Sequence, residues 1–311
     1  MGLLKEDVDM LDILIRAGSF VTIIFLGWGL RKIGVFRKED FSVLSAIVLK
    51  ITLPAAVIAS TAGKALDPSL LVITAIGIGC GILYMLLGYL MSIGASRGEK
   101  AFSLLNMSGY NLGNFTIPFV QSFLGPGAMV TASLFDTGNA VICLGGAYSV
   151  AAMVKDGNGF SLARVGKLLL RSVPFCCYVL MTMLNLCRIG VPGPVVSLAQ
   201  IIGDANAFLA MLMIGVGFQM QGDRGQIGKI AKVLVLRFGV AAILGAAIYF
   251  LLPFSLEIRQ TLTILVFSPI GSAVPAFTED LEEDVGLSSA INSISIVCSI
   301  VIIVTLLSVM L

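Results

Sequence analysis

Histidine is absent from this chain, and charged side chains are scarce. None of its 311 residues is histidine, which excludes zinc chemistry of the His-Glu-x-x-His type, Ser-His-Asp triads and histidine proton relays. Any proton exchange within the chain must therefore use carboxylates. The six cysteines form no Cys-x-x-Cys pair and lie mostly in apolar runs, so we expect small buried side chains. No combination of nucleophile and base is visible either, and we expect no enzyme.

The shortage of charge indicates a membrane protein. Only 12% of the residues are charged, 58% are hydrophobic and the mean hydropathy is +1.02, whereas about a quarter of a soluble domain is charged. Long apolar runs recur from one end to the other, so the predicted fold class is an all-α polytopic membrane protein within a lipid bilayer, with no nucleic-acid partner. Ten transmembrane helices are expected at residues 12–31, 41–62, 69–92, 101–124, 127–153, 165–186, 196–218, 230–252, 258–278 and 286–311.

The basic residues predict the orientation of these spans. Thirteen lie in one set of loops and four in the other, and the richer set should be cytoplasmic. Both termini are then extracytoplasmic, in a protein integral to the plasma (inner) membrane. The acidic run 279–284 falls on the basic side, which is tolerable because acidic residues weigh little in this rule. Arg16 and Arg237 fall near span ends, where we expect their charged groups to reach the interface.

Two of the spans are interrupted. The fourth contains NMSGYNLGNFTIP at residues 106–118, and the ninth contains SPIGSAVP at residues 268–275. In both, a polar residue, Asn111 or Ser268, lies seven positions before the final proline, Pro118 or Pro275. Non-helical backbone at membrane depth survives only where it lines a cavity or is buried in protein. We therefore expect these two stretches to line a cavity.

The position of the breaks predicts an inverted repeat. Each break is fourth in its half, so the chain divides as five plus five spans, and an odd number of spans inserts the second half from the opposite face. Paired interrupted helices at matching positions indicate a transporter binding site near the midplane, where half-helix N-termini attract anions and freed carbonyls attract cations. The predicted substrate-binding residues are Asn111, Gly113, Asn114, Pro118, Ser268, Gly271, Ser272 and Pro275.

A few polar residues lie deep in the other spans. Asp136 lies about 14 Å into the fifth span at the helical rise per residue, and Asn139 shares its helix face. An intramembrane carboxylate is a functional candidate; Asp136 could exchange a proton, help to hold Na⁺, or brace the broken fourth helix. In the tenth span Asn292 is their counterpart, and we add it to the coupling-ion candidates. Its neighbours Ser288, Ser289, Ser293 and Ser295 are expected mainly to pack against other helices.

Two further charged residues in the spans allow several interpretations. Lys50, in the second span, could meet an anionic substrate, pair with Asp136, reach an interface or lie at a subunit contact. Asp204 lies in the seventh span beside Asn206. A position at the membrane interface is at least as well supported for it as one in a cavity.

These motifs resemble the auxin efflux carrier family, which includes the plant PIN carriers and bacterial permeases for malate or malonate. The resemblance rests on NLGNFTIP at residues 111–118, Gly-Pro-Gly at 125–127, Asp-Thr-Gly-Asn at 136–139, Leu53-Pro54 and the break at 268–275. It covers the whole chain in length, span count and repeat position. Plant PIN carriers have a long cytosolic loop between their halves, whereas about ten residues (155–164) separate them here, which favours the bacterial branch. Serines stand in the second break where several relatives carry polar amides.

The resemblance implies the fold of bile-acid sodium symporters and sodium/proton antiporters, with the two broken helices crossing at the substrate site. Helices 1, 2, 6 and 7 would form a scaffold through which the chain forms a homodimer, and helices 3–5 and 8–10 a mobile transport domain. Residues 1–92 would then hold scaffold helices 1 and 2 with transport helix 3, residues 93–154 transport helices 4 and 5, residues 165–218 scaffold helices 6 and 7, and residues 229–311 transport helices 8–10.

The predicted function is secondary transport of a small carboxylate, such as malate, malonate or an auxin-like acid, by alternating access. No cofactor is expected beyond a coupling Na⁺ or H⁺, and no firm metal site. Two alternatives remain open: a monovalent cation/proton antiporter on the same fold, and a membrane-embedded ligand sensor.

Overall fold

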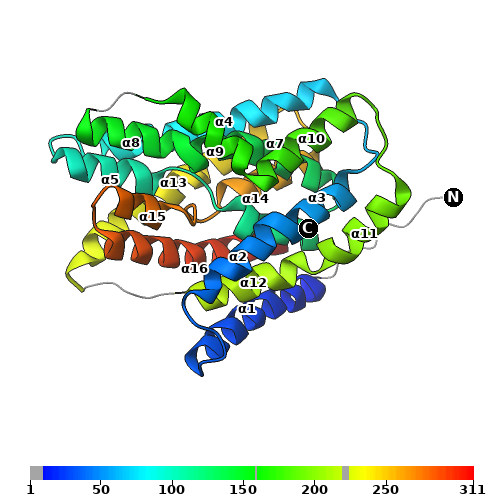
Figure 1. Cartoon of the computed structure of the whole chain (residues 1–311), viewed down its shortest axis with the longest axis horizontal. Coiled ribbons are helices and arrows are strands. Elements are labelled where there is room, and N and C mark those ends of the chain that lie inside the picture. The colour runs from blue at the N-terminus through cyan, green and yellow to red at the C-terminus, as the bar shows by residue number, and fades with distance from the viewer. Residues whose placement is uncertain (1–9, 158–159, 219–223) are drawn as a thin grey trace.

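The computed structural model describes residues 10–157, 160–218 and 224–311, and the regular structure in these ranges is helical (Figure 1). Seven helical segments are long and apolar enough to cross a membrane: Ile13–Lys32, Asp40–Thr61, Pro68–Leu90, Gly127–Asp156, Gly193–Gly217, Ile227–Leu251 and Val285–Met310. They correspond to the predicted spans 1, 2, 3, 5, 7, 8 and 10. The chain is therefore an all-helical polytopic membrane protein, as its composition predicts.

The predicted fourth and ninth spans are not continuous helices. In the fourth, α5 (Arg97–Met107) is separated by four residues from the wide turn η3 (Leu112–Thr116), which leads into α6 (Ile117–Phe123). In the ninth, α14 (Leu256–Val266) is separated by seven residues from α15 (Val274–Asp280). The half-helices match in length, because α5 and α14 each have 11 residues and α6 and α15 each have 7.

The sixth span differs from the prediction of one helix over residues 165–186. Two helices, α9 (Leu162–Arg171) and α10 (Val173–Leu186), meet at an angle of 82°. The bend lies at Ser172, whose hydroxyl accepts a hydrogen bond from Phe175 N and so begins α10. Helix α9 combines basic residues with leucines that are more than three-quarters exposed, Leu162 and Leu170. This combination is typical of a helix that lies along a membrane surface.

Wide helical turns modify two other spans. The second consists of α2 (Asp40–Ile47), the turn η1 (Val48–Thr52) and α3 (Leu53–Thr61), and the fifth of α7 (Pro126–Val141), η4 (Ile142–Gly146) and α8 (Ala147–Asp156). Pro54 lies in the first turn of α3, where its ring would crowd the carbonyl of the preceding turn. The wide turn η1 accommodates it and contains Lys50.

Glycines allow the closest helix contacts. Helix α1 (Met10–Lys32) packs on α12 (Asn206–Gly217), which continues from α11 (Gly193–Asp204). A methyl group on Gly215 would lie 2.0 Å from Ile24 O, and one on Gly27 would lie 2.3 Å from Leu212 O. Helix α4 (Val72–Leu90), preceded by η2 (Pro68–Leu71), packs on α7 in the same way through Gly77 and Gly138. Small residues at such contacts let two backbones approach closely in lipid.

The helices form two groups in space. Helices α1, α2, α3, α11 and α12 pack together at one side, and α10 packs between α3 and α7. The other group contains both interrupted segments, together with α4, α7, α8, α13 (Ile227–Leu251, after the short turn η5, Arg224–Gln226) and α16 (Val285–Met310) (Figure 1).

The acidic loop lies beside basic residues. Lys155, at the end of α8, pairs with Glu283 at 3.0 Å and also donates to Leu281 O. Gln226 donates to Asp284 from the start of α13. The acidic run 279–284 therefore lies beside Lys155 and beside the start of α13.

Candidate functional site

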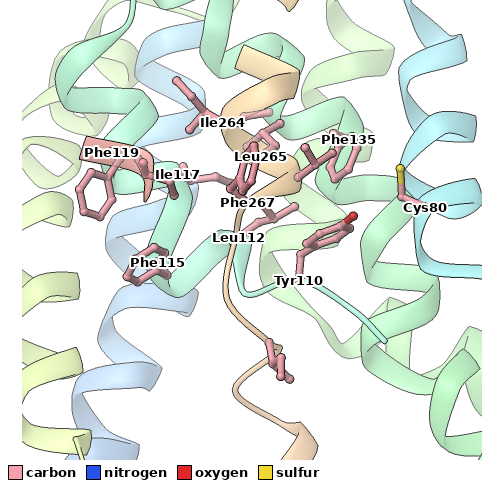
Figure 2. Close-up of a cluster of buried hydrophobic side chains, with 14 of the residues drawn as sticks. Cys80, Tyr110, Leu112, Phe115, Ile117, Phe119, Phe135, Ile264, Leu265 and Phe267 are labelled. Carbon is pink, nitrogen blue, oxygen red and sulfur yellow. The ribbon is translucent and has the colours of Figure 1, made fainter. Parts of the chain in front are cut away.

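The two interrupted segments cross and bond to each other. Asn111 N donates to Pro269 O at 2.9 Å, the hydroxyls of Thr116 and Ser268 are 2.6 Å apart, and Asn114 Nδ2 donates to Ser272 Oγ at 3.1 Å. Figure 2 shows the extended stretch after Phe267 passing beside Tyr110 and Leu112, with buried aromatic and aliphatic side chains packed around the crossing.

The local sequence explains where each helix stops and restarts. Gly109 has φ +72°, a conformation that glycine adopts without steric cost. After each break, a proline lies in the first turn of the new half-helix: Pro118 in α6 and Pro275 in α15. At the start of α15, Pro275 is tolerated because the first N–H groups of a helix have no partner within it. Pro118 follows the wide turn η3, as Pro54 follows η1.

Helix α7 holds the first break in place. Asn139 Oδ1 accepts from Tyr110 N at 2.9 Å, and Asn139 Nδ2 donates to Tyr110 O at 3.0 Å. The same Nδ2 donates to Asp136 Oδ1 at 2.9 Å, while Tyr178 from α10 donates its hydroxyl to Asp136 Oδ2, also at 2.9 Å. The buried Asp136 carboxylate is therefore oriented by two neutral donors.

Helix α16 holds the second break in an equivalent way. Asn292 Nδ2 donates to Ile270 O and Gly271 O, both at 3.1 Å, and Ser295 Oγ accepts from Ile270 N at 3.2 Å. Ser299 donates to Phe267 O at 2.7 Å. In each half, the helix that follows the break thus bonds to the unwound backbone.

Arg237 corrects a sequence-based expectation. It does not reach an interface: it is 1% exposed in the middle of α13, and its guanidinium bonds to both breaks. It donates to Met107 O at 2.5 Å and Gly109 O at 2.8 Å in the first break, and to Ser268 O at 3.3 Å and Pro269 O at 3.4 Å in the second. The span boundary drawn at residue 230 placed Arg237 near an end, whereas α13 begins at Ile227.

A first cavity of about 340 Å³ opens against the crossing. Among the residues that line it are five predicted substrate contacts, Asn111, Gly113, Asn114, Gly271 and Ser272, as well as Asp136, Asn139 and Lys50. Arg171, at the end of α9, and Tyr178 also line it, and neither was predicted. Both residues reach the cavity because the chain bends between α9 and α10; the local signal for that bend was Ser172 followed by Pro174, which is typical of a helix start.

A second cavity, of about 210 Å³, lies on another side of the same crossing. Asn111, Asn114 and Ser272 line both cavities. The second is also lined by Lys38 and Phe218, near the basic loops, and by Pro275, Asn292 and Ser293. The three shared residues are therefore reached from two directions.

Asn114 has an unused polar atom at this shared position. The side chain is 4% exposed, its Nδ2 bonds to Ser272, and its Oδ1 has no hydrogen-bond partner in the described part of the chain. Because a buried polar atom without a partner is costly, this position requires a ligand or water.

The structure separates the remaining predicted residues. Pro118 and Ser268 are buried, and neither of them lines the first or the second cavity. Lys50 is exposed in the first cavity, and the described residues include no ion pair between it and Asp136. Asp204 is exposed at the end of α11 and accepts from Gln200 at 2.6 Å, away from the crossing.

Hydrogen bonds link α6 to the group of helices formed by α1, α2, α3, α11 and α12. The buried Asn206 donates to Gln121 Oε1 and accepts from Thr52, both at 3.0 Å. Gln121 in turn donates to Gly203 O at 3.0 Å, and Arg16 donates to Ser122 O at 3.1 Å. The second half-helix of the first break is therefore fastened to the neighbouring helices.

Comparison with known proteins identifies the class. The family described as "Membrane transport protein" matches residues 19–158, which include the first break and the Asp136–Asn139 motif. The chain is also 24% identical over 292 residues to an "Uncharacterized transporter" of Methanothermobacter thermautotrophicus, across 91% of this chain and 93% of that protein. Apolar spanning helices and these similarities together define a membrane transport protein.

These similarities support the resemblance to the auxin efflux carrier family that the sequence motifs indicate. The bacterial malate or malonate branch of that family stays a prediction.

Proposed function

We propose that this protein is a secondary carrier of a small organic anion, whose carboxylate binds where Asn111, Asn114 and Ser272 meet. The observation that carries the proposal is the unsatisfied side-chain atom of Asn114 at the position shared by the two cavities. An amide can present either its oxygen or its nitrogen at a given position, so Asn114 can offer an N–H to a carboxylate while its oxygen accepts from Ser272.

The charges around the cavities favour an anion over a cation. Lys50 and Arg171 line the first cavity and Lys38 lines the second, whereas among the described lining residues the one carboxylate is Asp136. Clefts lined by one sign of charge concentrate ligands of the opposite sign. A volume of about 340 Å³ lies within the range of small-molecule sites and is suited to malate, malonate or an auxin-like acid.

The proposed architecture is a five-plus-five inverted repeat of ten spans. It is supported by the matched lengths of the half-helices and by the equivalent bonds from Asn139 and Asn292 to the two breaks. Helices 3–5 and 8–10 would move as a transport domain against helices 1, 2, 6 and 7, through which two copies of the chain would associate.

The proposed state is open to the cytoplasm. Lys38 and Arg171, which line the two cavities, belong to the basic loops that the positive-inside rule assigns to the cytoplasm. The link of Asn206 with Gln121 and Thr52 would close the opposite side. Alternating access then requires these bonds to break as the transport domain moves. Coupling to H⁺ or Na⁺ would involve Asp136.

Binding of carboxylates to the purified protein tests this proposal. A panel that includes malate, malonate and indole-3-acetate is added to wild type, and the shift in thermal unfolding temperature identifies a ligand. Asn111→Ala and Asn114→Leu are expected to abolish that shift while the unliganded protein stays folded. Asn185→Ala is the matched control, because Asn185 is also buried and bonds to a carbonyl, that of Thr61, outside the two cavities.

Two outcomes would refute the carboxylate site. One is unchanged affinity in both crossing variants, and the other is the absence of binding to wild type across the panel. Uptake of the identified carboxylate into proteoliposomes separates a carrier from a sensor, which binds without transport. A response to Na⁺ or pH gradients without organic substrate would favour the antiporter.

A further inference from the structure

Arg237 occupies the place where unwound transporter helices ordinarily hold a cation. Freed main-chain carbonyls in discontinuous helices coordinate Na⁺ in several carriers. Here the guanidinium bonds to carbonyls on both sides of the crossing: Met107 and Gly109 from the first break, Ser268 and Pro269 from the second. A single side chain thus joins the two unwound stretches through their oxygen atoms.

Main-chain oxygens of the second break also have hydrogen-bond donors. From Phe267 to Gly271 every main-chain oxygen accepts a hydrogen bond: Phe267 O from Ser299, Ser268 O and Pro269 O from Arg237, and Ile270 O and Gly271 O from Asn292. In the first break, Tyr110 O accepts from Asn139. A free metal ion coordinated there would have to share these oxygens with the donors already in place and lie beside the fixed positive charge of Arg237.

The surroundings of Arg237 are those of a cation site. Its guanidinium carbon lies 4.9 Å from the ring centroid of Tyr84 and 5.2 Å from that of Tyr110, distances at which aromatic rings attract cations. It also lies at the C-terminal end of α5 and just beyond that of α14, where the helix dipole favours positive charge. Among the described residues no carboxylate forms an ion pair with it.

We propose that Arg237 is a tethered cation that fills the carbonyl site at the crossing, so that this carrier requires no sodium ion there. Its place in transport rests on the proposed function, because the positive charge would sit behind the carboxylate site and move with the crossing. Coupling to sodium at the crossing is then excluded, and Asp136 remains the candidate for proton exchange.

Thermal unfolding without any carboxylate tests this inference separately from the proposed function. Wild type is expected to unfold at the same temperature in NaCl, KCl and choline chloride of equal concentration. Arg237→Ala is expected to lower that temperature by about 5–10 °C, because several buried carbonyls lose their donor. Guanidinium chloride at a non-denaturing concentration should restore a large part of the loss, because the free ion fits the vacated site, whereas urea at the same concentration should not.

Arg31→Ala is the matched control. Arg31 also donates to two main-chain carbonyls, those of Val216 at 2.8 Å and Phe218 at 3.1 Å, but outside the crossing. Guanidinium is not expected to restore the unfolding temperature of Arg31→Ala, because Arg31 is only partly buried and its site does not enclose a cation.

Sodium-dependent stabilisation of wild type would overturn the inference, and so would an Arg237→Ala variant that responds neither to guanidinium nor to Na⁺. If that variant does not survive purification, Arg237→Lys and Arg237→Met decide the question: the lysine variant, which keeps the charge, must unfold at the higher temperature, and equal temperatures refute the tethered cation. Failure of every carboxylate to bind wild type would refute the proposed function and leave these results unaffected.

Discussion

Asn139 and Asn292 hold equivalent breaks, yet their removal should differ in cost. Asn139 is 2% exposed and makes three bonds, two to Tyr110 and one to Asp136. Asn292 is half-buried, lines the second cavity and donates to two carbonyls. A buried group left without a partner costs about 1–3 kcal/mol, and water can satisfy a group that it reaches.

We therefore expect Asn139→Ala to destabilise the protein by about 3–5 kcal/mol, since it leaves both the N–H and the C=O of Tyr110, a residue only 1% exposed at the wall of the first cavity, without the amide. Asn292→Ala should cost about 1–2 kcal/mol, because Asn292 itself lines the second cavity and water there can take the place of its amide. The measurement is the thermal unfolding temperature of the purified variants in detergent, compared under identical conditions.

Thr137→Val controls for substitutions in α7, because the Thr137 hydroxyl bonds only within its own helix, to Ser133 O at 2.7 Å. Its unfolding temperature should stay close to that of wild type. An Asn292→Ala variant less stable than Asn139→Ala would refute the reasoning, since it would mean that burial does not decide which brace matters more.

Two further predictions concern ion coupling and helix packing. Asp136→Asn keeps a side chain that can bond to Tyr178, and it should weaken the dependence of transport on the pH or Na⁺ gradient; profiles identical to wild type would make Asp136 a structural brace. Gly215→Ala places a methyl group 2.0 Å from Ile24 O and should destabilise the protein by about 1–3 kcal/mol through overpacking. Gly29→Ala, with no atom within 4 Å of its added methyl group, should unfold like wild type, and equal unfolding temperatures for the two glycine variants would contradict this account of the α1–α12 contact.

The composition of the chain and the positions of its helix-interrupting residues were enough to predict much of this molecule. Hydropathy is a property of consecutive residues, so the membrane class and the approximate position of most spans followed directly from the chain. The breaks were equally visible, because glycine, proline and asparagine in an apolar run have local consequences for the backbone. Asn111, Asn114 and Ser272 could therefore be selected before their contacts were known.

Tertiary structure decided what those residues do together. The partners of Arg237 lie 128 and 130 residues away in the first break and 31 and 32 residues away in the second, and no local pattern records such a distance. Its depth was nevertheless available: an arginine in the middle of a span is a functional candidate, and a predicted span start at residue 230, later than the start of α13 at Ile227, concealed it. The two cavities that share Asn114 also depend on packing between distant segments, which the sequence specifies only through the fold.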